Sequence, residues 1–333
     1  MKNWQETEQL FMRLQAVWAA GGRAAMGVIT AIQGSTYRRP GAKLLIEEDG
    51  ALRGNISGGC LEEDVREAAL QALAGGKPRT LHYDTSDTED KVWGMGLGCN
   101  GQVDIWLVPF SSDQHAAVLP AVCERLQGDT SFLLHWLANG DLCLDPVGAS
   151  STLIFTEDLE PPPTLLICGA GEDALPLARL AHTAGFRVVV ADHRSAYLTA
   201  QRFPQARQRI LIRPEDHVPG ELLTDRTLAV VKTHSAQHDA AWVRRLAATA
   251  VPYIGVLGPR ERRDEIRNTI DPAAHPRIYG PVGLDIGGEG PEQVALSIVA
   301  EALACWHNRQ GGPLRNRKIA IHAQPREGDI HDG

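Results

Sequence analysis

Residues 165–194, LLICGAGEDALPLARLAHTAGFRVVVADHR, constrain the fold of this chain more than any other segment. A short apolar run is followed by the glycine turn Gly169-x-Gly171-x-x-Ala174, a helical pattern, and a second apolar run that ends at Asp192. Gly169 permits a tight turn, Gly171 allows a diphosphate to approach the backbone, and the small Ala174 lets helix and strand pack closely. The segment therefore predicts a βαβ unit of the dinucleotide-binding type.

The remainder of the second half repeats this alternation of strand and helix. Short apolar runs predict strands, and amphipathic stretches with proline near the start or glycine at the end predict helices. We expect strands at 164–168, 186–192, 207–212, 226–233 and 252–258, and helices at 172–185, 238–250, 259–270 and 290–307. Strands separated by helices of this length pair in parallel, so this half is expected to form a Rossmann-like, doubly wound parallel sheet.

The run Pro161-Pro162-Pro163 marks a boundary, because consecutive prolines cannot continue a helix and favour an extended connector. We therefore expect an α/β protein of two domains: an N-terminal α+β domain, residues 1–160, and the Rossmann-like domain, residues 161–333. The topology of the first domain is left open by its sequence. Its expected helices lie at 3–21, 61–76 and 112–127, and its expected strands at 24–32, 42–48, 102–109, 131–138 and 151–156.

The overall charge of the chain argues against nucleic acid and anionic membranes as binding partners. The 333 residues carry a formal net charge of -8, whereas broad contact with nucleic acid or an anionic membrane needs basic stripes. No apolar run approaches the roughly 20 residues of a membrane span, and the N-terminal residues MKNWQETEQL lack the apolar core of a signal peptide. We therefore expect a cytoplasmic protein that binds neither nucleic acid nor membrane. Its six cysteines, without CxxC spacing, are expected to be thiols.

The ends of the expected strands carry polar residues that indicate a ligand site. Ligands of open α/β sheets bind outside the carboxyl ends of the strands, and here those ends precede Asp192, Lys232, His234, Arg260 and, in a glycine-rich loop, Asp285. The cationic groups among them favour an anionic ligand. His234 is a candidate acid–base group for hydride transfer, although a single histidine is more often a structural hydrogen-bonding residue. No GxSxG or HExxH motif indicates a hydrolase.

Whether the glycine turn binds a dinucleotide is left open by the sequence. Glu172 and Asp173 stand where a diphosphate would meet the helix N-terminus. Acidic residues there stabilise the helix through its dipole, but they repel a bound phosphate. The two alternatives are a Rossmann-like sheet that binds NAD(P) and one that binds no dinucleotide, because a fold does not dictate a function. Because of the two acids, we expect NAD(P) to bind weakly or not at all.

Longer motifs follow one another along nearly the whole chain. They are GSTYRRPGAKLLI, GNISGGCLEEDV, DTSDTEDKVWGMGLGCNG, CGAGEDALPLARLA, VADHR, KTHSAQHD, YIGVLGPRERR and PVGLDIGGEGPEQVALSIVAEALA. Together they resemble the XdhC/CoxI family, the accessory proteins of molybdenum hydroxylases such as xanthine dehydrogenase and carbon monoxide dehydrogenase. One departure lies in the glycine turn, where this chain has Glu172 and the family often has Pro or His.

The resemblance implies a maturation factor rather than a turnover enzyme. Such a protein binds the molybdenum cofactor (molybdopterin), assists its sulfuration and delivers it to an apo molybdenum hydroxylase of the xanthine dehydrogenase or carbon monoxide dehydrogenase type. The implied partners are that apo-hydroxylase, a cysteine desulfurase and, in a homodimer, a second copy of this chain. The alternatives are an NAD(P)-dependent oxidoreductase that uses the Rossmann-like domain and a protein-interaction scaffold in which that domain is vestigial.

Two cysteines lie in glycine-rich loops within these motifs. Cys60 follows Gly58 and Gly59, and Cys99 lies in the segment GLGCNG. Glycine lets a ligand approach the backbone closely, and a soft thiolate suits a soft metal or a sulfur-transfer step. We therefore expect both cysteines to contact the molybdenum or to take part in sulfur transfer, the alternative being that both are small buried fillers in turns.

Cationic residues near a Gly-Ser turn complete the expected site. Arg38, Arg39 and Lys43 belong to the motif GSTYRRPGAK, which forms either a phosphate clamp or a solvated charge cluster. The resemblance implies that the cofactor-binding residues are Cys60, Cys99, Arg38, Arg39, Gly169, Gly171, Asp192, His234, Arg260 and Asp285.

Overall fold

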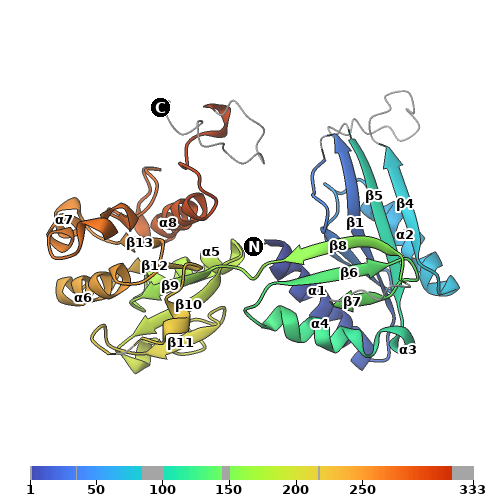
Figure 1. The fold of residues 1–333 in the computed structure, drawn as a ribbon, viewed down its shortest axis with the longest axis horizontal. Coiled ribbons are helices and arrows are strands. Elements are labelled where there is room, and N and C mark those ends of the chain that lie inside the picture. The colour runs from blue at the N-terminus through green and yellow to red at the C-terminus, as the bar shows by residue number, and fades with distance from the viewer. Residues whose placement is uncertain (1, 35, 85–100, 145–150, 217, 317–333) are drawn as a thin grey trace. The chain divides into compact units, whose positions relative to one another are not determined.

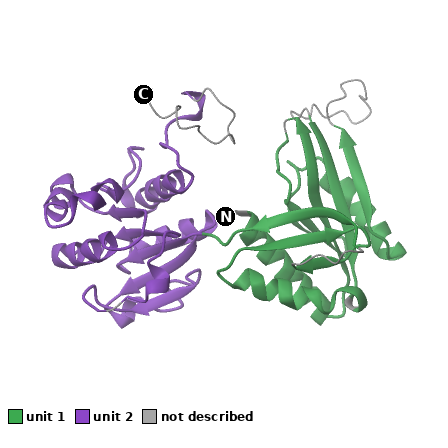
Figure 2. Ribbon diagram, in the orientation of Figure 1, with its two compact units in different colours: residues 1–162 green, residues 163–333 purple. Residues whose placement is uncertain are grey.

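The computed structural model describes residues 2–34, 36–84, 101–144, 151–216 and 218–316 (Figure 1). The chain divides into two compact units, residues 1–162 and residues 163–333 (Figure 2), and the three consecutive prolines lie at this division. Among the described residues, none of the helices combines the length and the apolar composition that a membrane span requires.

The first unit is built on a five-stranded antiparallel sheet, which we call the large sheet. Its strand order is β3-β2-β1-β5-β4. The strands are β1 (Ala24–Gly34), β2 (Lys43–Glu47), β3 (Leu52–Gly54), β4 (Arg79–Asp84) and β5 (Gly101–Phe110). The central strands β1 and β5 pair along their whole length, from Ala24 opposite Phe110 to Gly34 opposite Gly101.

Both faces of the large sheet are buried. Ala24, Met26 and Val28 of β1 pack into one core, whereas Ala25 and Ile29 of the same strand pack into another. Successive side chains of a strand point to opposite faces of its sheet, so this alternation separates the two cores. The large sheet is therefore the middle layer of the first unit.

A second sheet and several helices cover the two faces. The small antiparallel sheet has the order β7-β6-β8 and consists of β6 (Phe132–Leu137), β7 (Leu142–Leu144) and β8 (Leu153–Leu159). The helices are α1 (Lys2–Ala19), α2 (Glu62–Gly75), α3 (Ser112–His115) and α4 (Val118–Gln127). Helices α1 and α4 share one core with the small sheet, and α2 covers the opposite face of the large sheet.

The second unit is a six-stranded parallel sheet with helices on both faces (Figure 1). Its order is β11-β10-β9-β12-β13-β14. The strands are β9 (Thr164–Cys168), β10 (Arg187–Asp192), β11 (Gln208–Leu211), β12 (Thr227–Val231), β13 (Tyr253–Val256) and β14 (Ile278–Tyr279). The α-helices are α5 (Ala174–Thr183), α6 (Ala236–Ala247), α7 (Arg260–Arg267) and α8 (Gly290–Trp306). Short 3-10 helices lie at Ser195–Tyr197, Gly220–Leu222, Pro272–Arg277 and Leu314–Asn316.

The predicted fold class is confirmed. β9 pairs in parallel with both β10 and β12, with Thr164 opposite Arg187 on one side and Thr227 on the other. The helix α5 packs against α8, and α6 packs against α7. Four strands lie outside the ranges expected from the sequence, β3, β4, β7 and β14, because they are short, exposed or only half-buried and so carry little apolar periodicity.

Candidate functional site

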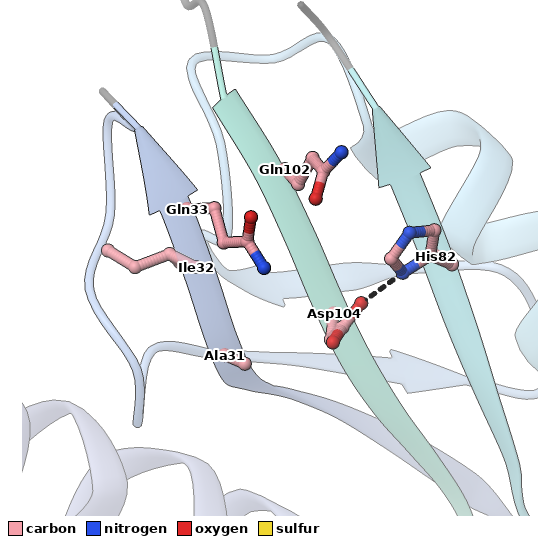
Figure 3. A pocket seen from close by; sticks show the side chains of 6 residues that line it. All are labelled: Ala31, Ile32, Gln33, His82, Gln102 and Asp104. Carbon is pink, nitrogen blue, oxygen red and sulfur yellow. Dashed lines mark hydrogen bonds and ion pairs between the residues drawn. The ribbon is translucent and has the colours of Figure 1, made fainter.

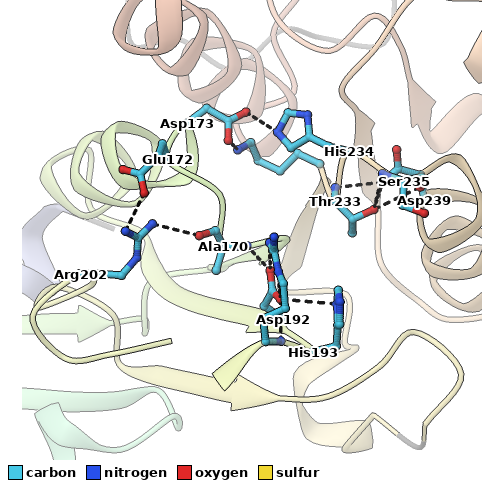
Figure 4. Close-up of polar contacts among 12 residues, drawn as sticks. Ala170, Glu172, Asp173, Asp192, His193, Arg202, Thr233, His234, Ser235 and Asp239 are labelled. Atoms are coloured by element: carbon cyan, nitrogen blue, oxygen red, sulfur yellow. Dashed lines mark hydrogen bonds and ion pairs between the residues drawn. The ribbon is translucent and has the colours of Figure 1, made fainter. Parts of the chain in front are cut away.

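The glycine turn, residues 169–173, lies between β9 and α5 at the carboxyl end of the parallel sheet (Figure 4). Gly169 has a φ of 115°, a conformation that glycine adopts without steric cost. A Cβ atom at Gly169 would lie 2.5 Å from the carbonyl oxygen of Lys232. The turn therefore packs directly on the chain that leaves β12.

Asp192, the last residue of β10, holds the glycine turn in place. Its Oδ2 accepts a 2.7 Å hydrogen bond from the backbone N–H of Ala170, and both of its oxygens accept bonds from the Arg194 guanidinium at 2.9 and 2.8 Å. Burial alone would raise the pKa of Asp192, but the bonds from Arg194 and Ala170 lower it to about 2. Asp192 is therefore an ionised structural link whose oxygens are already engaged, rather than an acceptor open to a ribose hydroxyl.

Asp173 lies at the centre of a charged cluster formed with Lys232 and His234 (Figure 4). Asp173 Oδ1 is 2.5 Å from Lys232 Nζ, and Asp173 Oδ2 is 3.0 Å from His234 Nε2. Burial lowers the pKa of the Lys232 ammonium, although the neighbouring carboxylate opposes this shift. Burial by itself would raise the pKa of Asp173, but Lys232 and His234 lower it. The cluster thus keeps Asp173 ionised beside a buried cation.

The side chain of Asp173 also fills the space beside Gly171. A Cβ atom at Gly171 would lie 2.9 Å from Asp173 Oδ1, and the missing side chain of this second glycine is what gives a diphosphate its close approach in a dinucleotide-binding unit. Glu172, in contrast, forms a 2.7 Å ion pair with Arg202, which also donates to the carbonyl oxygen of Ala170 at 3.3 Å. The sequence argument treated the two acids alike, whereas only Asp173 obstructs the turn.

His234 follows β12 in a backbone conformation that few residues other than glycine adopt. Its φ is 60°, and its side chain is exposed. On one side of it, the N–H and hydroxyl of Thr233 donate to Asp239 Oδ1 at 3.0 and 2.6 Å, and on the other side Ser235 caps α6. These bonds fix the loop so that the imidazole faces Asp173.

The remaining predicted rim residues take no part in these contacts. Arg260 is the exposed first residue of α7, and Asp285 is exposed in the loop between β14 and α8. Arg262 of α7 instead contacts α6, where its Nη1 donates to Oδ2 of Asp239, the residue that also accepts from Thr233 in the loop after β12. The sequence argument thus identified the correct helix start but did not single out this arginine.

Cys60, in the first unit, lies in a loop that Ser57 organises. The Ser57 hydroxyl oxygen accepts hydrogen bonds from the backbone N–H groups of Gly59, Cys60 and Leu61 at 3.0, 3.1 and 3.2 Å. The Glu62 carboxylate in turn accepts bonds from the Ser57 N–H, at 2.9 Å, and from the Ser57 hydroxyl. These bonds fix the turn that precedes α2.

The Cys60 thiol is half-buried, and the space around the preceding glycines is open. A Cβ atom at Gly58 or at Gly59 would meet no other group within 4 Å. The alternative of a buried filler therefore does not fit Cys60. Cys99 lies outside the described residues, and so the predicted partnership of the two cysteines stays a prediction.

The cationic residues of the first unit occupy three different environments. Lys43 is buried, and its ammonium donates to Glu157 Oε2 at 2.6 Å and to the Thr7 hydroxyl at 2.8 Å. Arg38 forms a half-buried ion pair with Glu6, and Arg39 is exposed. The phosphate-clamp hypothesis is therefore wrong for Lys43, because its charge is already compensated inside the protein.

A shallow hollow lies on the large sheet (Figure 3), lined by Ala31, Ile32, Gln33, His82, Gln102 and Asp104. His82 Nδ1 contacts Asp104 Oδ1 across it. The hollow has a volume of about 30 Å³, room for about one or two water molecules. It is therefore too small for a bulky ligand.

Two of the other described cysteines have buried surroundings. Cys123 and Cys168 are buried, and burial raises the pKa of the Cys123 thiol to about 11 and that of Cys168 well above its ordinary value. Both thiols are therefore protonated fillers. Within the described ranges, no group of three or more His, Cys, Asp or Glu side chains is arranged to hold a metal ion.

Comparison with known proteins links both units to one family. The family described as XdhC and CoxI matches residues 17–84, and the XdhC Rossmann domain matches residues 165–302. A Bacillus subtilis protein, described as a probable xanthine dehydrogenase subunit, is 35% identical, over 84% of this chain and 92% of that protein. The chain belongs to the XdhC and CoxI family. The matched segments of this XdhC and CoxI member contain the Cys60 loop and the glycine turn.

Two further relatives extend the comparison. The molybdenum cofactor insertion chaperone PaoD of Escherichia coli is 26% identical to this XdhC and CoxI member, over 90% of this chain and 92% of PaoD. A Bacillus halodurans protein, whose crystal structure is described as that of a xanthine dehydrogenase, is 29% identical with a TM-score of 0.78, over 92% of this chain and 98% of that one. The fold of this chain is therefore found in a solved relative of similar length.

Two features of the site were missed by sequence reasoning. Asp173 was expected only as an obstacle to phosphate, yet it bridges Lys232 and His234. Arg202, the partner of Glu172, lies 30 residues further along the chain in a segment without a motif. The sequence does contain a signal for the role of Asp173. Asp173 is an acid at the start of a helix, and a lysine and a histidine follow the neighbouring strand of the sheet, so the acid can pair with both. No comparable signal marks Arg202.

Proposed function

We propose that this protein binds the molybdenum cofactor in the cytoplasm, assists its sulfuration, and inserts it into an apo-hydroxylase of the xanthine dehydrogenase or carbon monoxide dehydrogenase type. The observation that carries the proposal is the likeness to PaoD, a molybdenum cofactor insertion chaperone, over about nine-tenths of both chains. The partners proposed are the apo-hydroxylase, a cysteine desulfurase and a second copy of this chain.

The proposed contact to the metal is the Cys60 thiol, with Cys99 as its partner. A half-buried thiol next to two glycines with open space around them supports this role, because a bulky cargo can approach such a loop without displacing side chains. Thiolate sulfur also suits molybdenum and sulfur transfer. Ser57 is the positioning residue, since its hydroxyl holds the backbone N–H of Cys60.

The anionic parts of the cargo are assigned to cationic and backbone groups. In the first unit, Arg39 is exposed and Arg38 is already paired with Glu6, so Arg39 is the stronger of the two candidates. In the second unit the proposed contacts are Gly169, Gly171, Asp192, His234, Arg260 and Asp285. Within this set, Asp192 acts by holding the turn, because its oxygens are engaged by Ala170 and Arg194.

The test is to purify the protein from a molybdate-fed host that makes the cofactor, and to measure bound molybdenum and oxidised-pterin fluorescence together. We expect both signals in equimolar amounts from the natural chain and a loss of at least fivefold from Cys60→Ser. The matched control is Cys143→Ser, a second half-buried thiol of the same unit, which is expected to retain the cargo. Absence of both signals from the natural chain, or equal retention by Cys60→Ser, would contradict the proposal.

The alternative of an NAD(P)-dependent oxidoreductase gains no support from the glycine turn. The carboxylate of Asp173 lies where a diphosphate would approach Gly171, and the oxygens of Asp192 are engaged within the protein. Both features disfavour a bound dinucleotide.

A further inference from the structure

The carboxylate of Asp173 is placed as a bound anion would be. Asp173 precedes the first residue of α5 but makes no side-chain capping bond there, although aspartate at this position usually accepts from the first free N–H groups of its helix. Its Oδ1 instead lies against Gly171 and Lys232, and its Oδ2 lies against His234. The side chain therefore occupies the space between the glycine turn and the loop after β12 (Figure 4).

Lys232 is incompletely satisfied by this arrangement. Its side chain is only 2% exposed, and Nζ is 2.5 Å from Asp173 Oδ1. Asp173 is the one partner of Nζ among the described residues, and no second acceptor is found for this ammonium. An ammonium carries three N–H groups, and a buried polar group without a partner costs roughly 1–3 kcal/mol. A carboxylate thus compensates the charge of Lys232 without meeting its hydrogen-bonding capacity.

A second cation flanks the same turn. Arg202 pairs with Glu172 and donates to the carbonyl oxygen of Ala170, yet its Nε is buried without an acceptor. The N-terminus of α5, which carries the positive end of the helix dipole, completes the surroundings. Two buried nitrogen atoms beside the turn, Lys232 Nζ and Arg202 Nε, therefore have donor capacity that the described acceptors do not use.

A phosphate group matches these surroundings better than a carboxylate does. It carries about −1.5 to −2 charges near pH 7 and three strong acceptor oxygens. We propose that the glycine turn is a binding site for a phosphate monoester or diphosphate group, and that Asp173 is an internal competitor which occupies this site until such a ligand displaces it. Lys232 and His234 bind either anion in turn. The displacement of Asp173 deepens the function proposed above, which assigns an anionic part of the cofactor to the same turn, and only the identity of the larger ligand rests on that function.

The competition is tested by calorimetry on the full chain at pH 7.5, with inorganic phosphate as the probe. Asp173→Asn keeps the shape of the side chain and removes its charge, and we expect it to bind phosphate at least tenfold more tightly than the natural chain. The matched control is Asp225→Asn, the same change at an exposed residue. Asp225 precedes β12 and so lies at the amino ends of the strands, away from the glycine turn at their carboxyl ends. We expect this control to change phosphate affinity less than twofold.

A second variant separates a local site from a general effect of charge. Lys232→Met in the Asp173→Asn background is expected to lose the gain in affinity, because it removes the buried ammonium. Equal phosphate affinity of Asp173→Asn and the natural chain would overturn the proposal. So would equal gains in Asp173→Asn and Asp225→Asn.

Removal of Asp173 leaves Lys232 without its counter-charge, so a measurement on the natural chain guards against misfolding of the variant. In NMR spectra of the side-chain nitrogens, phosphate at tens of millimolar is expected to shift the His234 resonances as Asp173 leaves, while those of the buried His115 stay in place. His234 resonances that do not move would count against the site. Titration with ADP then identifies the source: tighter binding of ADP than of phosphate to Asp173→Asn indicates a nucleotide, and equal binding indicates the phosphate group alone. Both results uphold the site.

Discussion

The backbone N–H of Ala170 donates a 2.7 Å hydrogen bond to Oδ2 of Asp192, which joins the turn after β9 to the end of β10. The side chain of Asp192 is 2% exposed, and Arg194 covers both of its oxygens. In dinucleotide-binding proteins the acid at this position binds the ribose hydroxyl. Here it instead connects the turn after β9 to the end of β10.

The Asp192 link should make the second unit sensitive to acid. The pKa of Asp192 is about 2 in the folded chain, below its ordinary value of about 3.9. The stabilisation, roughly 2 kcal/mol, is fully present above about pH 4 and is lost as the pH falls from about 4 to 2. We expect Asp192→Asn to speed amide hydrogen exchange in residues 164–192 at pH 7 and to differ little from the natural chain near pH 2. If the exchange rates of the variant and the natural chain differed as much near pH 2 as at pH 7, this account would be contradicted.

The buried ion pair of Lys43 and Glu157 should show strong coupling. Each side chain is 1% exposed, and removal of one partner of a buried pair leaves an uncompensated charge that costs roughly 3–5 kcal/mol. We expect Lys43→Met and Glu157→Gln to lower the free energy of unfolding by that amount singly. The double variant should recover most of the loss, because the remaining amide oxygen still accepts from Trp136, as Glu157 does at 2.8 Å. Additive losses in urea unfolding would argue against the pair.

Ser57→Ala should loosen the Cys60 loop. The change removes the acceptor of three backbone N–H groups in the turn before α2, a loss of roughly 1–3 kcal/mol for donors left without a partner. We expect Cys60 to react faster with a thiol reagent while the rate at Cys143 stays constant. Gly58→Ala is the control, because its added Cβ meets open space. A labelling rate at Cys60 that Ser57→Ala leaves unchanged would remove Ser57 from its positioning role.

Gly169 and Gly171 should differ in their tolerance of a side chain. Gly169→Ala combines a φ of 115° with a contact of 2.5 Å to the Lys232 carbonyl oxygen, so we expect a loss of at least about 2 kcal/mol. At Gly171 the one close contact of the added Cβ is the end of the Asp173 side chain, at 2.9 Å, which can turn away, and the His234 ring lies at an ordinary distance of 3.7 Å. Thermal unfolding of the two variants should therefore show a large decrease for the first and a smaller one for the second.

NADH and NADPH should bind the natural chain weakly, because Asp173 obstructs the approach to Gly171. We expect dissociation constants above about 100 μM by calorimetry and no hydride transfer. A dissociation constant in the low micromolar range, an affinity of about 8 kcal/mol, would instead restore the oxidoreductase alternative.

Periodicity was enough to predict the second unit, because each of its longer strands is a continuous apolar run between helices of ordinary length. Thr227–Val231 and Tyr253–Val256 are buried at every residue, and a parallel sheet covered on both faces requires that pattern. The first unit was harder to predict, because its sheets pair antiparallel between segments far apart in sequence, such as β1 with β5. No local pattern specifies such pairings.

The sequence was enough to predict which strand ends carry the residues of the site. It was not enough to predict which of these residues contact one another. The sequence placed Asp192, Lys232 and His234 after neighbouring strands, and the structure places all three at the glycine turn. It did not reveal that Asp173 would turn toward Lys232 while Glu172 turned toward Arg202. The choice between these rotamers depends on cations from other segments, and a single sequence does not encode their distances.

The link between Lys43 and Glu157 also sets an order of events on the ribosome. The two residues are 114 positions apart, so at 5–20 residues per second the strand that carries Lys43 is made about 6 to 23 s before Glu157. During that interval the carboxylate that pairs with Lys43 in the folded unit is absent. We therefore expect the first unit to close only after its final strand, β8, has been synthesised.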